Sequence, residues 1–185
     1  MIVGHYAAAL LPRESRVPFW ALLLASNLAD FVWLALALAG PEAPVPSSLL
    51  DASLRGLRVN MPYSHNLLPT FALALVTAGA AGAIWRDARG ALWCGGLVLI
   101  HLACDLVSGF EHQILGERSA PIGLDLYRRS PHLALVIEAA FGAACVLWFS
   151  RRGAVPRRRL IALYAVFVGG ALLWLPTATI PLGRL

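Results

Sequence analysis

Residues 90–109 of the chain read GALWCGGLVLIHLACDLVSG, an apolar segment that carries one histidine and one aspartate. A helix needs about 20 residues to cross the hydrocarbon layer of a bilayer, and this segment has that length. Because lipid offers no hydrogen-bond partner to open backbone groups, the segment is expected to be helical. His101 and Asp105 would then lie one turn apart on the same helix face. The segment therefore predicts a membrane helix with two ionisable side chains at bilayer depth.

The rest of the chain has the same apolar character. Hydrophobic residues make up 59% of it and charged residues 14%, whereas a soluble domain carries about a quarter charged residues. Four further segments are long and apolar enough to span, at residues 17–40, 67–85, 132–149 and 160–180. We therefore predict an all-α fold, a polytopic membrane bundle of about five transmembrane helices that forms one domain over residues 1–185.

The ends of these segments indicate how the chain crosses the membrane. Residues 1–12, MIVGHYAAALLP, are apolar but too short to span, and we expect a short helix against or inside the membrane. The arginine-rich stretch 151–159, RRGAVPRRR, is expected in the cytoplasm by the positive-inside rule. Alternation then places loops 41–66 and 110–131 outside. The net charge of +5 thus reflects topology, and no nucleic-acid partner is expected.

Polar side chains recur within or beside the predicted spans. A charged group at the bilayer centre costs about 2.5–3.5 kcal/mol on insertion scales, so such groups usually have a partner or a function. The ionisable side chains are His5, Asp30, His65, His101, Asp105, His112 and Glu138, and their polar neighbours are Asn27, Ser64 and Ser108. Imidazole nitrogen and carboxylate oxygen are both good ligands for Zn²⁺. The set indicates either a divalent metal site or hydrogen-bonded pairs that hold helices together without metal.

Four short motifs, taken in order, resemble a known family. GH at 4–5, LAD at 28–30, YSHNLLP at 63–69 and HLACD at 101–105 look like the pattern of the membrane-bound metal-dependent hydrolases. These are small bacterial inner-membrane proteins, also described as LexA-binding hydrolases. The stretch PIGLDLYRRSP at 121–131 takes the place of the family's Pro-rich loop. The chain departs from the pattern at Val32, Trp33, Asn60, Met61 and Pro62, where the family has further histidine, aspartate, arginine and glycine positions.

The resemblance implies a metal site in an inner-membrane protein. Its ligands would be His5, Asp30, His65, His101 and Asp105, flanked by Ser64 and Asn66 as hydrogen-bonding groups. We expect Asn27, Ser108 and His112 to surround the same site, because they share helix faces with the ligands. The expected cofactor is a divalent ion, Zn²⁺ by ligand type.

The implied activity is hydrolysis of an ester or phosphoester of a lipid, a lipid-linked molecule or a small molecule. Asp105 or Glu138 would act as general base, and Arg128 and Arg129 could hold a phosphate of the substrate. Two alternatives stay open. Intramembrane carboxylates and histidines also build transporters or permeases, and a non-catalytic membrane scaffold could use them as helix contacts.

Overall fold

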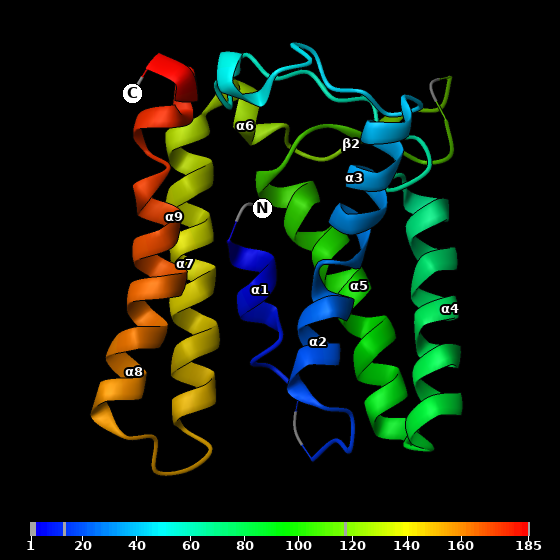
Figure 1. Cartoon of the computed structure of the whole chain (residues 1–185), viewed down its shortest axis with the longest axis vertical. Coiled ribbons are helices and arrows are strands. Elements are labelled where there is room, and N and C mark those ends of the chain that lie inside the picture. Colours follow the sequence, from blue (N-terminus) through cyan, green and yellow to red (C-terminus); the bar gives the residue numbers. More distant parts are fainter. Residues whose placement is uncertain (1–2, 13, 117, 185) are drawn as a thin grey trace.

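In a computed structural model, which describes residues 3–12, 14–116 and 118–184, the chain is a bundle of helices (Figure 1). Three helices are long and apolar enough to cross a membrane: α4 (Leu67–Trp85), α5 (Ala88–Ser108) and α7 (Pro131–Ser150). A fourth crossing is formed if α2 (Phe19–Ser26) and α3 (Leu28–Ala39) count as one bent span. The predicted all-α class and membrane character are confirmed at this level.

The first predicted span, 17–40, is bent at Asn27 by 56°. The Asn27 amide donates back to the Leu23 carbonyl and to Ser26 Oγ, so the side chain competes with the regular helix pattern. At this break the Ser26 carbonyl accepts a hydrogen bond from the His101 ring instead of from its own helix. The bend therefore joins the first span to α5 at the level of the polar residues.

The last predicted span, 160–180, is a series of short helical pieces. These are α8 (Arg157–Tyr164), the π-helical turn η2 (Ala165–Gly169), α9 (Gly170–Leu173) and the 3₁₀ turn η3 (Pro176–Ala178). They run alongside α7 (Figure 1). At Gly142 of α7 a Cβ atom would lie 2.9 Å from the Phe167 carbonyl, so only glycine permits this close approach. Helix length thus supports three or four crossings and does not support the predicted five.

The predicted short N-terminal helix, α1 (Gly4–Ala8), lies inside the bundle and not on its surface (Figure 1). It packs against α2, α5 and α7, and its His5, Ala7 and Ala8 are buried. The Arg152 guanidinium donates to the carbonyls of residues 10, 11 and 12, which follow the helix. Because these carbonyls have no helical partner, Arg152 fixes the segment that returns α1 toward α2.

The connections between helices gather at two ends of the bundle (Figure 1). One end holds loops 41–66 and 110–131, with η1 (Leu49–Asp51), the antiparallel pair β1 (His112–Gln113) and β2 (Pro121–Ile122), and α6 (Leu126–Arg129). The C-terminal turn η4 (Leu182–Arg184) lies at the same end.

At the opposite end Asp87 caps α5 and accepts the Arg16 backbone N–H, and these hydrogen bonds lower the pKa of its carboxyl group.

We expect Arg152→Ala to lower the free energy of unfolding by at least about 2 kcal/mol, because three hydrogen bonds are lost and one from a charged donor alone contributes about 1.5–3 kcal/mol. The measurement is reversible denaturation in detergent. Arg151→Ala is the matched control, since Arg151 is the exposed neighbour. Equal stability of the two variants would contradict the role of Arg152 in holding α1.

Candidate metal centre

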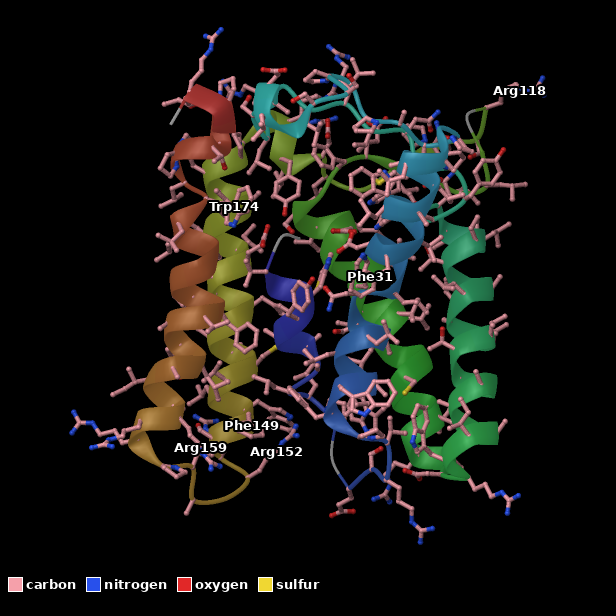
Figure 2. All side chains as sticks on the ribbon, viewed as in Figure 1. Phe31, Arg118, Phe149, Arg152, Arg159 and Trp174 are labelled. Carbon is pink, nitrogen blue, oxygen red and sulfur yellow. The ribbon has the colours of Figure 1, made fainter. Side chains whose placement is uncertain are left out.

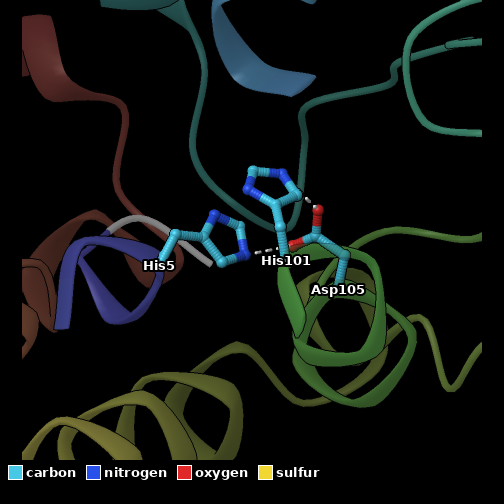
Figure 3. A group of neighbouring side chains, drawn as sticks. All are labelled: His5, His101 and Asp105. Atoms are coloured by element: carbon cyan, nitrogen blue, oxygen red, sulfur yellow. Dashed lines mark ion pairs between the residues drawn. The ribbon is translucent and has the colours of Figure 1, made fainter. Parts of the chain in front are cut away.

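Five ionisable side chains from separate parts of the chain meet inside the bundle. His5 comes from α1, Asp30 from α3, and His65 from the segment that precedes α4. His101 and Asp105 come from α5, where they lie one turn apart as predicted (Figure 3). The structure thus brings together all five residues that the sequence indicated as ligands. Two overlapping groups, His5–His101–Asp105 and Asp30–His65–His101, each have ligand atoms within 4.8 Å of one another and could hold a metal ion.

Four of these side chains form what we call the inner set: Asp30, His65, His101 and Asp105. The two Nε2 atoms of the histidines are 3.2 Å apart. His65 Nε2 lies 3.4 Å from Asp30 Oδ1 and 3.7 Å from Asp105 Oδ2. His101 Nε2 lies 3.3 Å from Asp105 Oδ2 and 3.7 Å from Asp30 Oδ1. Two ligands at about 2.0–2.1 Å from one tetrahedral zinc ion would be about 3.3–3.4 Å apart. Each of these neighbouring pairs is therefore spaced like two ligands of one ion, and Asp30, His65 and His101 together form one of the two possible ligand groups.

His5 contacts the remaining oxygen of each carboxylate. Its Nδ1 lies 3.4 Å from Asp30 Oδ2, and its Nε2 lies 3.2 Å from Asp105 Oδ1. Its ring also stacks on the His101 ring, with centroids 3.5 Å apart. The inner oxygens of the two carboxylates thus face His65 and His101, while the outer oxygens face His5. His5 therefore links the two aspartates, and its ring also lies close enough to His101 and Asp105 to serve as a metal ligand.

Hydrogen bonds on the far side of each ring determine which nitrogen faces the inner set. His101 Nδ1 is 2.9 Å from the Ser26 carbonyl, which can only accept, so this nitrogen carries a proton. His65 Nδ1 is 2.8 Å from Ser64 Oγ, whose own proton goes to Glu42 Oε2 at 2.6 Å. His65 Nδ1 must therefore donate as well. In their neutral forms both imidazoles direct a lone pair from Nε2 into the inner set.

This arrangement gathers lone pairs and negative charge at one buried point. The side chains of His5 and His101 are 0% exposed, His65 3% and Asp105 8%, so water screens them poorly. Two carboxylates and two lone pairs at these distances repel one another unless positive charge lies among them. A divalent cation supplies that charge, and protonation of both imidazoles would supply it without metal. The residues present thus fit a divalent ion.

Glu42 belongs to the site but was not predicted from the sequence. It is 1% exposed, and its carboxylate accepts from Ser64 Oγ and from the backbone N–H groups of Tyr63 and Ser64. These contacts build a chain from Glu42 through Ser64 to His65, of the kind that orients metal-binding histidines. Glu42 lies in the Pro-rich stretch 41–48, where no periodicity or motif marks it.

Glu138 lies outside both groups of ligand atoms. Its Oε2 accepts the Val3 backbone N–H at 3.1 Å, and its Oε1 accepts from the Tyr127 hydroxyl. Burial and the nearby carboxylate raise the pKa of Tyr127 well above its usual value, so the hydroxyl stays protonated and donates. Glu138 was predicted as a general base, but the structure places its carboxylate at the start of α1 and at Tyr127, outside both groups of ligand atoms.

The remaining residues that were predicted to surround the site or bind substrate do not all contact the inner set. Ser64 contacts His65 as expected, whereas Asn27 bonds to its own helix and Ser108 to the Cys104 carbonyl. Asn66 accepts the Gln113 backbone N–H at the start of α4. Arg128 and Arg129 pair with Asp125, at 2.6 and 3.8 Å, in the loop that ends at α7.

His112 lies against the site. Its ring stacks on His65, with centroids 5.6 Å apart and planes at 11°. It is 2% exposed, and burial lowers its pKa to about 4, so the ring is neutral at pH 7. Within the described part of the chain, neither ring nitrogen has a hydrogen-bond partner.

The site opens into a cavity beside Asp30. Asp30 is 42% exposed, far more than the other members of the inner set, and it lines a cavity of about 450 Å³ together with His65, Asp105 and His112. Most of the remaining cavity wall is apolar. A substrate could therefore approach the inner set from the side of Asp30.

Comparisons of the chain with protein-family models, with curated proteins and with solved structures find no match. Function is therefore inferred from the geometry of the site.

Replacing Ser64 by alanine should weaken divalent-ion binding by about 10–100-fold, the usual effect of removing a group that orients a ligand histidine. Competition with a chromogenic chelator measures the affinity. Ser108→Ala is the matched control, because Ser108 is an equally buried serine that bonds to its own helix. Equal affinities in the two variants would exclude the chain from Glu42 to His65 as a determinant of binding.

Proposed function

We propose that the protein is an integral membrane metal-dependent hydrolase that acts on an ester or phosphoester of a lipid or lipid-linked substrate. The observation that carries the proposal is the inner set, two carboxylates and two imidazole lone pairs within 3.2–3.7 Å of their neighbours and open on one side. A site that only held helices together would have no need of an open side. The resemblance of the motifs to the membrane-bound metal-dependent hydrolases supports the same activity.

Zn²⁺ is the proposed ion, because imidazole nitrogen and carboxylate oxygen are among its usual ligands, and three protein ligands would leave one coordination position open. Such an ion lowers the pKa of water and offsets negative charge that develops on an ester or phosphoester oxygen. The residues that would hold it are His65, His101 and Asp105, with Asp30 beside them on the open side. His5 would hold the two carboxylates in position through their outer oxygens.

The other catalytic roles are assigned from how exposed each side chain is. Both carboxylates line the cavity, but Asp30 is much the more exposed, so its oxygens are best placed to accept a proton or a hydrogen bond from a water on the substrate side. Asp105 is enclosed by three imidazoles, which suits a ligand better than the general base predicted from the sequence. The buried rings of His5 and His101 exclude water from the far side.

The same proposal includes five membrane crossings in a bacterial inner membrane. The series α8, η2 and α9 runs along α7, and these pieces together would supply the fifth crossing. The arginine-rich connection 151–159 would face the cytoplasm, so the cavity would lie in the outer half of the membrane.

We expect the detergent-purified protein to contain a stoichiometric divalent ion by elemental analysis. The double variant His101→Ala Asp105→Ala should lose it, because two members of the inner set are removed. His132→Ala is the matched control, since His132 is an exposed histidine at the start of α7. Protein that holds no ion and whose stability does not change with chelator would exclude the hydrolase and leave the scaffold.

Turnover should depend on the same ion. Hydrolysis of a long-chain nitrophenyl ester or a nitrophenyl phosphoester in micelles is expected to fall at least about 100-fold on chelation and to return with Zn²⁺. Asp30→Asn should also lower kcat, because the carboxylate that faces the cavity loses its charge. Uptake of metal into sealed vesicles without turnover of either probe would instead favour the transporter.

A further inference from the structure

The cavity beside the inner set is built to hold something apolar. It has a volume of about 450 Å³, within the usual range for small-molecule sites. Its wall includes Phe31, Trp33 and Leu34 of α3, Leu54 of the outer loop and Trp174 at the end of α9. Asp30, His65 and Asp105 form its polar end. A ligand in this cavity would therefore place a long apolar part against α3 and a polar part at the site.

The cavity reaches the surface that lipid would cover. Phe31 is 43% exposed and Leu34 is 47% exposed, although both lie on a helix of the first span. Figure 2 shows Trp174 and Phe31 on opposite sides of α1 in this view. An opening between α3 and α9 would admit a molecule sideways from the bilayer, without passage through water.

A second, polar hollow of about 260 Å³ adjoins the cavity at the outer end of the bundle. The two share Leu57, Val59, Met61 and Phe110 as a common wall. Charged side chains of both signs line the second hollow: Arg58 and Arg128, together with Glu111 and Asp125. Arg128 is paired with Asp125, whereas Arg58 forms no ion pair among the described residues. The neighbouring hollows thus offer an apolar space toward the membrane and a polar space, with charges of both signs, toward the outer face.

His112 lines the cavity beside the inner set. It is buried, and within the described residues both of its ring nitrogens are without a hydrogen-bond partner. Buried polar atoms are nearly always paired, so each exception requires an explanation. A ligand oxygen in the cavity would accept a hydrogen bond from this ring. His112 therefore indicates where the polar part of the ligand lies.

We propose that the two hollows form a binding site for a glycerophospholipid that enters sideways from the bilayer. An acyl chain occupies the apolar cavity, its ester or phosphoester oxygen bonds to His112, and the headgroup lies in the polar hollow with its phosphate near Arg58. The fate of the lipid rests on the proposed hydrolase, but its binding does not. The apolar cavity wall and the polar hollow beside it both favour an amphiphilic lipid over a soluble ester.

The test uses phosphatidylglycerol that carries a photoactivatable diazirine on the acyl chain, in vesicles that contain the full-length protein. Cross-links located by mass spectrometry should concentrate at Phe31, Leu54 and Trp174 and exceed those at Leu75 and Val76, which face outward on α4. Leu34→Trp narrows the cavity and should abolish the excess. Leu24→Trp is the matched control, because Leu24 is a similarly exposed leucine of the same bent span that lines a different hollow.

A second variant tests the polar contact without filling the cavity. His112→Phe keeps an aromatic ring beside His65 but removes both nitrogens, so retention of phosphatidylglycerol in native mass spectrometry should weaken about tenfold, the equivalent of one hydrogen bond. Equal labelling of the cavity and of the outer face of α4, or unchanged labelling in Leu34→Trp, would overturn the lipid site. Should Leu34→Trp fail to fold, the wild-type labelling map and His112→Phe still decide.

Ion content measured on the same samples separates the two proposals. Cavity labelling in a protein that binds no ion would leave the lipid site standing and exclude the hydrolase. A full complement of ion without cavity labelling would exclude the lipid site alone.

Discussion

The placement of two carboxylates in an apolar bundle is the constraint on which the rest of the structure depends. Asp30 and Asp105 approach three imidazoles from different helices, and no single pair would offset the cost of burying the Asp105 charge. Each carboxylate uses one oxygen toward His5 and the other toward His65 and His101. The five side chains therefore behave as one unit, in which the position of each depends on the positions of the others.

Irregular features of the fold make that unit possible. The bend at Asn27 turns the Ser26 carbonyl toward His101 and fixes that ring. The cap that Arg152 places on residues 10–12 holds α1 inside the bundle, where its short length would otherwise give it little stability of its own. A regular five-helix bundle would have neither feature. The departures from ideal helices thus occur where the polar centre requires them.

The sequence was most informative where the relation between residues is local. His101 and Asp105 share a face because a helix turn separates them, and the order of the four motifs indicated all five residues that meet. Glu42 and the Ser26 carbonyl could not be predicted, because their contacts join segments that have no common periodicity. Glu138 was assigned to the site from its depth in the membrane alone, and depth does not specify which neighbour a carboxylate meets. Helix length likewise failed for 160–180, where a π-helical turn interrupts the regular pattern.

The site is closed by buried rings on one face and open to a mostly apolar cavity on another, and this difference fits a substrate from the membrane. His5 and His101 close the inner face, whereas Asp30 is the member of the inner set left open, and it opens toward a mostly apolar wall. A site for a water-soluble substrate would gain nothing from Phe31 and Leu34 at its entrance, since these side chains would face lipid. The polar hollow shares Leu57, Val59, Met61 and Phe110 with this cavity, so the proposed function would let water and an apolar ligand approach from different sides. Separate approaches for water and for an apolar ligand would suit the proposed hydrolysis of a membrane-resident molecule.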